Sequence, residues 1–265
     1  MYAFDFVKPA SVEEALKALQ TEDAQALGGG QTLIPALKQR LAAPSQLVSL
    51  ADIEALKGVK VEGGAVVAGG AATHHAIAEA TAEAAPSIAA LANRIGDPAV
   101  RHRGTIGGSL ANNDPSACWP AAALALGATI KAQGPNGTRE IAADDFFEGM
   151  FATALGEGEL IVEVRMPVPA RGAYAKFPQP ASRFALVGVF VAEVDGKVRV
   201  AVTGASEGGV FRWTEAEEAL SSNFSADALE GLSVPADGMI GDLHGDPAYR
   251  AHLVKVMTRR AVASA

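Results

Sequence analysis

Two glycine-rich stretches, ALGGGQTLIPALKQR at residues 26–40 and RHRGTIGGSLANNDP at residues 101–115, are the most informative parts of this sequence. Neither fits the dinucleotide fingerprint G-x-G-x-x-G or the phosphate loop G-x-x-x-x-G-K-[ST]. One glycine-rich turn says little in a chain with 28 glycines, because such a turn is usually an ordinary loop. Two such turns, each beside a hydroxyl group, leave ordinary loops and an anion site as open alternatives.

Glycine runs suit anion binding for a physical reason. They lack the Cβ atoms that keep a ligand from the backbone, and they permit positive φ angles that turn several N–H groups toward one point. Residues 28–32 are expected to form one nest of amides, and a helix beginning near Leu33 would add its positive end. A second nest is expected at Thr105, Gly107 and Gly108. Two nests suit a diphosphate, whose charged oxygens face two sides.

The segments around the first glycine turn alternate between strand and helix. The run AQAL at residues 24–27 is predicted as a strand, residues 33–41 keep helical spacing, and LVSL at residues 47–50 is a second strand. Before them, Ser11 and Glu14 form a capping box at the start of a helix. The first 56 residues therefore read as one strand–turn–helix–strand unit.

Hairpins and helices follow in mixed order. The turn residues Gly63-Gly64, Pro135-Asn136-Gly137 and Asp195-Gly196 each separate two strand-like runs, which predicts three hairpins. Helical spacing is seen at residues 73–85, 87–95, 119–126, 214–221 and from Asp246, which would cap the last helix, onward. This order predicts an α+β protein. A cluster of prolines from residue 167 to 180 marks the main boundary, giving three units at 1–56, 57–168 and 169–265.

Composition excludes several classes of function. With 30 acidic and 22 basic side chains the net charge is -8, which argues against nucleic acid as a partner. No apolar stretch reaches the roughly 20 residues of a membrane span. Asp5 and Lys8 lie where a signal peptide would be apolar, so a cytoplasmic location is expected. Cys118 is the one cysteine and the five histidines have no ligand spacing, so redox chemistry would need an organic cofactor rather than a metal site.

The two glycine stretches together resemble the flavoprotein (medium) subunit of the molybdenum hydroxylases, the family of carbon-monoxide-dehydrogenase-like and xanthine-dehydrogenase-like enzymes. The paired motifs are GGGQTLIP at residues 28–35 and TIGG at residues 105–108. The opening FDFVKPASVEEALKAL and the ending DPAYRAHLVKVMTRRA are similar to the two ends of that family. The resemblance therefore extends over essentially the whole chain.

The resemblance implies a vanillyl-alcohol-oxidase-type (PCMH-type) FAD-binding fold, with two N-terminal α/β subdomains and a C-terminal α+β flavoprotein domain. The first glycine stretch would surround the FAD pyrophosphate, and Thr105 and Gly108 would close over it from the second subdomain. The residues that the resemblance assigns to the first stretch are Leu27, Gly28, Gly29, Gly30, Gln31, Thr32, Leu33 and Ile34.

Further positions are implied along the rest of the cofactor. Ile95 matches an apolar position against the cofactor, and Ile161 matches one whose backbone lies near the adenine or flavin portion. Lys176 matches a lysine near the isoalloxazine ring, where a positive charge would favour the reduced flavin. The family often has a cofactor-contacting aspartate where this chain has Cys118, and Asp114 is the nearest substitute.

Other conspicuous residues have simpler interpretations. Arg101 and Arg103 are interpreted as rim charges rather than diphosphate ligands, although they flank the second turn. His74 and His75 follow Thr73, a predicted helix cap, and are expected to face solvent. Trp119 and Trp213 are expected in the core or at an interface, Cys118 is expected to be buried, and no catalytic residue is assigned.

The resemblance implies an electron-transfer role. Substrate would be oxidised at a molybdenum pterin cofactor in a large subunit, and electrons would pass through two [2Fe-2S] clusters in a small subunit to FAD in this chain and then to an external acceptor. A dimer of heterotrimers is the expected assembly. The alternative is a free-standing flavin oxidase or reductase of the same fold, and a module that binds a nucleotide diphosphate without redox turnover is a third possibility. The sequence does not identify the substrate of the complex or the electron acceptor.

Overall fold

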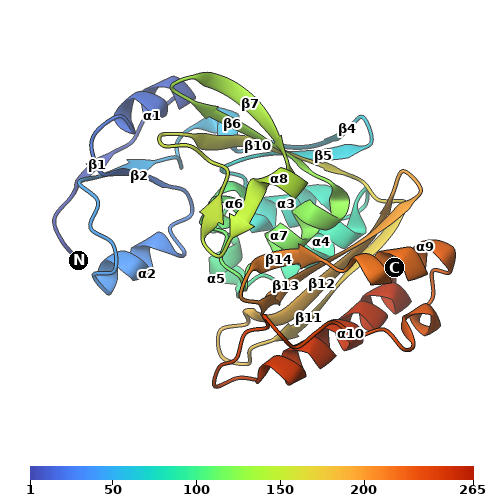
Figure 1. Ribbon diagram of the computed structural model, residues 1–265. Coiled ribbons are helices and arrows are strands. Elements are labelled where there is room, and N and C mark those ends of the chain that lie inside the picture. Colours follow the sequence, from blue (N-terminus) through green and yellow to red (C-terminus); the bar gives the residue numbers. More distant parts are fainter.

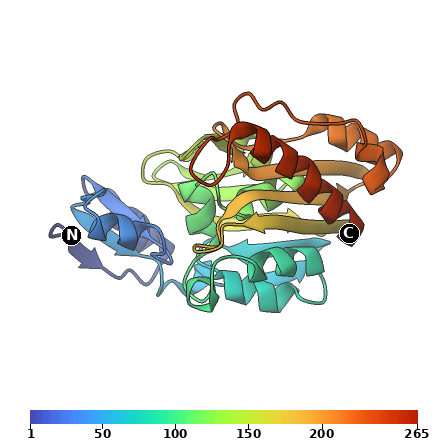
Figure 2. The same ribbon diagram turned by 90° about the horizontal axis from the view of Figure 1, so that it is seen from below.

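The computed structural model describes residues 1–265, which form three main sheets arranged one after another along the chain (Figure 1). The first is a parallel sheet of three strands in the order β1-β3-β2, with two helices. Its elements are β1 (Asp5–Val7), α1 (Val12–Ala18), β2 (Ala24–Leu27), α2 (Leu33–Lys38) and β3 (Gln46–Ser49). This N-terminal unit lies at one end of the molecule (Figure 2).

The predicted capping box starts α1. The Ser11 hydroxyl accepts a hydrogen bond from the Glu14 N–H at 3.2 Å. The Glu14 carboxylate reaches back to the Ala10 N–H at 2.8 Å, one residue before the expected partner. Val12 and Ala15 are buried against this sheet, so the apolar face of the helix is the one that its spacing predicts.

The second sheet has five antiparallel strands in the order β4-β5-β10-β6-β7. Its strands are β4 (Val59–Glu62), β5 (Ala65–Gly69), β6 (Thr129–Gly134), β7 (Gly137–Ala142) and β10 (Leu160–Pro167). A 3-10 turn, η1 (Glu54–Leu56), precedes it, and β8 (Phe147–Gly149) pairs with β9 (Ala152–Thr153) as a separate ribbon. The helices that follow β5 are α3 (His74–Thr81), α4 (Pro86–Asn93), α5 (Pro98–Arg101), α6 (Ile106–Asn112) and α7 (Trp119–Leu126), with α8 (Ala143–Phe146) after β7.

The third sheet is an antiparallel meander of four strands whose middle strands are buried on both faces. Its elements are β11 (Arg171–Pro178), β12 (Ala185–Val194), β13 (Lys197–Ser206), β14 (Gly209–Arg212), α9 (Thr214–Ser222), η2 (Ala226–Leu229) and α10 (Pro247–Ser264). Val187, Val189 and Val191 point into a core beneath α9 and α10, whereas Phe190 and Ala192 point into the core around α7. This alternation follows from the two-residue period of a strand.

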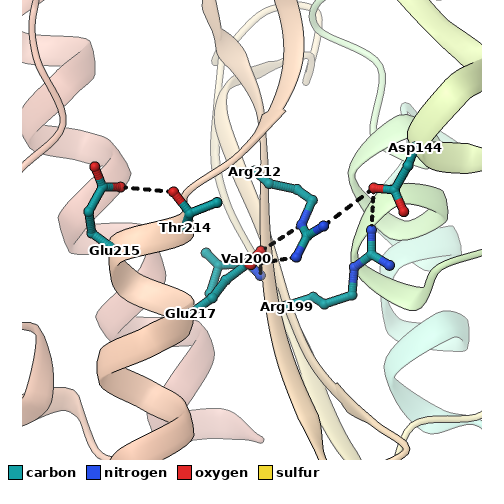
Figure 3. A network of polar contacts seen from close by, with 7 residues as sticks. All are labelled: Asp144, Arg199, Val200, Arg212, Thr214, Glu215 and Glu217. Atoms are coloured by element: carbon teal, nitrogen blue, oxygen red, sulfur yellow. Dashed lines mark hydrogen bonds and ion pairs between the residues drawn. The ribbon is translucent and has the colours of Figure 1, made fainter.

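An ion-pair network joins the second sheet's helices to the third sheet (Figure 3). Asp144 in α8 binds Arg199 of β13 and Arg212 of β14. Arg212 also pairs with Glu217 of α9, whose carboxylate accepts the Val200 N–H at 2.9 Å.

The division of the chain into three units at residues 56/57 and 168/169 stays a prediction, although each main sheet lies within one of the three ranges. No helix combines the length and the apolar composition that crossing a membrane requires.

Candidate functional site

The two glycine-rich stretches lie in direct contact. A Cβ atom on Gly28 would lie 2.9 Å from Thr105 Oγ1, and one on Gly29 would lie 1.9 Å from the carbonyl oxygen of Arg103. Real Cβ atoms do not approach backbone oxygens this closely, so only glycine fits at residue 29. The loop at residues 28–32 therefore packs against the turn that precedes α6.

The first stretch presents a row of unused hydrogen-bond donors. The backbone N–H groups of Gly28 through Leu33 make no hydrogen bond within the chain, whereas the next one, from Ile34, bonds the Gly30 carbonyl at 3.1 Å. Thr32 begins α2 without a side-chain cap. Partly exposed N–H groups without partners at a helix start are the usual setting for an anion.

Apolar side chains hold this loop in shape. Gly30 has a φ of +73°, which favours glycine, and its open side faces the Ile34 and Leu27 side chains. Leu27 ends β2 and Ile34 lies in the first turn of α2, so these two predicted residues support the loop from either end. The Gln31 side-chain amide donates to the Gly29 carbonyl at 3.3 Å.

The second stretch differs from the predicted nest. Residues 106–112 are helix α6, Gly107 donates its N–H to the Gly70 carbonyl at 2.9 Å, and Gly108 donates to Thr105 Oγ1 at 3.1 Å. The expectation of free amides at Gly107 and Gly108 is therefore wrong. Gly107 is required by close packing instead, because a Cβ there would lie 2.4 Å from the Gly70 carbonyl oxygen.

Thr105 nevertheless keeps a donor. Its hydroxyl accepts the Gly108 N–H, and a hydroxyl also carries one proton that it can donate. No acceptor for that proton is found within the chain. The side chain lies against Gly28, so a ligand at the first loop is within reach of the Thr105 hydroxyl. Gly108 is exposed beside it, on the first turn of α6.

Ile95 and Ile161 lie in different surroundings. The Ile95 carbonyl accepts from the Arg101 guanidinium at 3.1 Å, and its side chain packs partly buried on the core around α7. Ile161 is buried in β10, beside a register shift in its pairing with β6. Its carbonyl oxygen lies 1.9 Å from the position of a Cβ on Gly70, and the Gly70 carbonyl accepts the Gly107 N–H, so this glycine links β10 to α6.

Lys176 is not solvated. It is only 8% exposed, and its ammonium group donates to the carbonyls of Arg94 at 2.6 Å and Arg183 at 2.8 Å and contacts Cys118 Sγ at 3.5 Å. Since an ammonium group has three N–H donors, all three are used within the chain. Lys176 can therefore act on a cofactor through its charge, and a direct hydrogen bond would require one of these contacts to break.

Cys118 and Asp114 have separate roles. Cys118 is buried, as predicted, next to the Tyr174 hydroxyl, which has no hydrogen-bond partner. Burial, followed by the neighbouring Cys118, raises the pKa of Tyr174 well above its ordinary value, so this hydroxyl stays neutral. The Asp114 carboxylate accepts the Ser116 N–H at 2.8 Å and so stabilises a local turn. Contacts of either residue with cofactor hydroxyls stay a prediction.

His74 corrects a sequence expectation. It is 4% exposed rather than facing solvent, and its Nδ1 accepts the Trp119 Nε1–H at 3.0 Å. Burial, and secondarily the charge of Arg101, lowers the pKa of His74 to about 4, so the ring is neutral with its proton on Nε2. The buried indole N–H of Trp119 was the available signal, because such a group needs an acceptor. His75 instead stacks on His102, 3.8 Å between ring centres.

The rim interpretation of the two arginines holds in part. Arg103 is exposed, but its carbonyl supports the contact with Gly29. Arg101 is half-buried and its guanidinium donates to the carbonyls of Ile95 and Gly96, both at 3.1 Å. Sequence reasoning missed Gly104 as well, whose carbonyl accepts the His74 N–H at 3.0 Å. Gly104 could have been found in the sequence because it lies between Arg103 and Thr105, which were both considered for the site.

The chain is similar to known proteins over its whole length. Residues 2–169 match the family model described as the FAD binding domain in molybdopterin dehydrogenase. The nicotine 6-hydroxylase medium subunit of Paenarthrobacter nicotinovorans is 36% identical over 276 residues, which cover 99% of this chain and 97% of that protein. The carbon monoxide dehydrogenase medium chain of Afipia carboxidovorans is 36% identical over 279 residues, covering 98% and 96%.

Solved structures share the whole fold. The reconstituted CO dehydrogenase from Oligotropha carboxidovorans includes a chain that matches with a TM-score of 0.86 at 34% identity, over 99% of this chain and 97% of that one. Quinoline 2-oxidoreductase from Pseudomonas putida 86 matches with a TM-score of 0.86 at 29% identity, over 100% and 97%. These likenesses confirm the fold class expected from the sequence.

Proposed function

The chain belongs to the family of FAD-binding domains of molybdopterin dehydrogenases, and on this basis we propose that it is the FAD-carrying electron-transfer subunit of a molybdenum hydroxylase complex. It would take electrons from the iron-sulfur clusters of a partner subunit and pass them to an external acceptor. The relatives are dehydrogenase or hydroxylase subunits, which supports an oxidoreductase role.

The row of unused N–H groups from Gly28 to Leu33 carries the assignment of the cofactor site. An FAD pyrophosphate would accept hydrogen bonds from this row of N–H groups and, from the other side, one from the Thr105 hydroxyl. Glycine at residues 28 and 29 keeps the row within reach of Thr105, because any side chain there would push the two stretches apart. The residues present therefore fit the cofactor that the family binds.

The remaining predicted residues would position the rest of the cofactor. Leu27 and Ile34 contact the loop at Gly30, and Leu33 begins α2 directly after it. Ile95 and Ile161 would border the cofactor on the side of the second sheet. Lys176 would place a fixed positive charge near the flavin, because its ammonium group is locked by two carbonyls and a thiol. Bound FAD would supply the exchange between one-electron and two-electron transfer.

The partner subunits are inferred from the cluster ligands that this chain does not have. One cysteine cannot hold an iron-sulfur cluster, so the two [2Fe-2S] clusters and the molybdenum pterin cofactor would be in a small and a large subunit. Relatives are named as medium chains, which favours this assembly over a free-standing flavin enzyme. A dimer of heterotrimers in the cytoplasm is the arrangement we propose, with neither nucleic acid nor a membrane span involved.

The spectrum of the purified full chain tests the proposal. We expect flavin absorption with one FAD per chain, or stoichiometric binding when FAD is added. Co-expression with the two neighbouring subunits should yield a complex whose flavin is reduced by the substrate of the large subunit. A chain that binds no FAD would contradict the proposal, and a flavin reduced by an organic substrate without any partner would favour the free-standing alternative.

A further inference from the structure

The turn at residues 102–105 is attached to the beginning of α3 by backbone hydrogen bonds. The His74 N–H donates to the Gly104 carbonyl at 3.0 Å. The Ile106 N–H donates to the Ala72 carbonyl at 3.0 Å, so the two segments form a short antiparallel bridge. The place of this turn in the molecule is therefore set by α3 and the residues just before it.

The same turn forms one wall of the proposed diphosphate site. A Cβ atom on Gly29 would lie 1.9 Å from the Arg103 carbonyl oxygen and 2.6 Å from the Gly104 Cα, so the glycine loop packs directly on this turn. Thr105, whose hydroxyl faces the loop, ends the turn. Any shift of the turn away from α3 would move both the wall and the hydroxyl donor.

Two histidine side chains add a second contact between α3 and the turn. The rings of His75 in α3 and His102 in the turn are stacked, with centres 3.8 Å apart and planes inclined by 26°. His102 Nδ1 lies 2.7 Å from the Pro98 carbonyl, and a carbonyl only accepts, so Nδ1 carries a proton. His75 Nε2 lies 3.2 Å from a carboxylate oxygen of Glu79. Each ring is thus oriented by a further partner.

The charges around this pair can compensate one proton but not two. The elements packed against α3 are α4, which has no charged residue, β4 and α5. The charged side chains on or beside α3, β4 and α5 are Lys60, Glu62, Glu79, Asp97, Arg101 and Arg103. Glu79 is the one among them that contacts either ring. A second proton, on His102, would place two positive rings 3.8 Å apart, with an arginine on either side of His102 in the chain.

We propose that the His75–His102 stack is a positioning pair for the FAD site, and that acid weakens FAD binding by charging both rings. With at most one charged ring, the stack keeps the turn against α3. With two charged rings, the repulsion removes this contact and the turn loosens. Histidine side chains titrate between about pH 5 and 8, so the change falls in that range. The inference rests on the proposed function, because it requires FAD at residues 28–32 and Thr105.

The test is a fluorescence titration of the full chain with FAD at about pH 7.5 and about pH 5.5, which span most of the histidine range. His102→Phe keeps a flat ring for the stack but cannot become charged. His75→Ala removes the stack. His252→Phe makes the same change at an exposed position of α10 and is the matched control for His102→Phe. The ring of His74 stays neutral at both pH values, because burial lowers its pKa to about 4.

At the higher pH we expect the wild type, His102→Phe and His252→Phe to bind FAD alike. His75→Ala should bind it about fivefold more weakly, because a stacked ring pair is lost. At the lower pH the wild type and His252→Phe should lose affinity about fivefold, whereas His102→Phe should keep its affinity. A loss confined to the chains that can charge both rings is not expected of a contact that serves only stability.

The same fall in FAD affinity with pH in His102→Phe as in the wild type would overturn the inference, whether or not His75→Ala folds. A folded His75→Ala chain that binds FAD as the wild type does at both pH values would also overturn it. In either case FAD is still bound at the higher pH, and the proposed function is unaffected. A wild-type chain that binds no FAD at either pH would instead contradict the proposed function, and this inference with it.

Discussion

Thr105 Oγ1 lies 2.9 Å from where a Cβ atom of Gly28 would be, although Gly28 follows β2 of the first sheet and Thr105 caps α6, 77 residues further along the chain. The contact joins a loop with unpaired N–H groups to a hydroxyl that has a proton to donate. Either stretch alone would be an ordinary turn. Together they would give the diphosphate of the proposed cofactor hydrogen-bond donors from two sides.

Gly29→Ala should separate the two stretches. The added methyl group would overlap the Arg103 carbonyl, so the loop must move away from Thr105. We expect FAD affinity, measured by fluorescence titration, to fall at least tenfold, which corresponds to about 1.4 kcal/mol. Gly58→Ala is the matched control, because a Cβ at Gly58 meets nothing within 4 Å. Unchanged FAD affinity in Gly29→Ala would show that the contact has no role in binding.

Comparing Thr105→Val with Thr73→Val separates the two roles of the Thr105 hydroxyl, which are to cap α6 and to bind FAD. Both threonines cap short helices, since Thr73 accepts from the Ala76 N–H and Thr105 from the Gly108 N–H. Each variant should lower the free energy of unfolding by about 1 kcal/mol. Only Thr105→Val should also weaken FAD, by about tenfold, because only Thr105 faces the loop. Equal FAD affinities in the two variants would contradict a role for this hydroxyl in the site.

His74 should make the protein less stable in acid. Its pKa is about 4 in the folded chain and about 6.5 when unfolded, so the unfolded state binds more protons between these values. Stability is therefore complete above pH 6.5 and declines as the pH falls, by about 2 kcal/mol at pH 5 and about 3 kcal/mol at pH 4.

Urea unfolding at pH 7, 5 and 4 checks this prediction. In His74→Gln the amide oxygen can still accept from Trp119, but the side chain does not titrate. The difference in unfolding free energy between wild type and variant should shrink or reverse by the amounts above as the pH falls. A difference that is constant with pH would show that His74 is protonated as easily in the fold as outside it.

Lys176→Gln should lower the midpoint potential of the bound flavin by some tens of millivolts, because a fixed positive charge that favours the reduced form is removed. Glutamine keeps donors for the carbonyls of Arg94 and Arg183, so folding should be retained. Lys60→Gln, an exposed lysine on β4, is the control and should leave the potential unchanged. A potential unaffected by Lys176→Gln, measured by dye equilibration, would exclude an electrostatic role for this lysine.

Local features of the fold were predictable from the sequence. The three hairpin predictions are confirmed as the pairs β4–β5, β6–β7 and β12–β13, and Asp195 and Gly196 have the positive φ angles that such a turn needs. The caps Ser11, Thr73 and Asp246 are likewise confirmed. Each depends on residues within a few positions of one another.

Features that join distant segments were not predictable. Strand β10 lies between β5 and β6, and β1 pairs in parallel with β3, neither of which any local pattern encodes. The Gly107 N–H bonds the Gly70 carbonyl and the Gly108 N–H bonds the Thr105 hydroxyl. The sequence therefore suggested free donors at residues whose N–H groups are already used. The burial of His74 beside Trp119, 45 residues away along the chain, has the same cause.

A crystal structure of the full chain with FAD bound is the most direct measurement of the central claim, which is that the two glycine stretches hold the cofactor's diphosphate together. The account predicts pyrophosphate oxygens within about 3 Å of backbone nitrogens of residues 28–32 and of Thr105 Oγ1. A diphosphate held elsewhere, with the N–H groups of residues 28–32 still facing solvent, would contradict it.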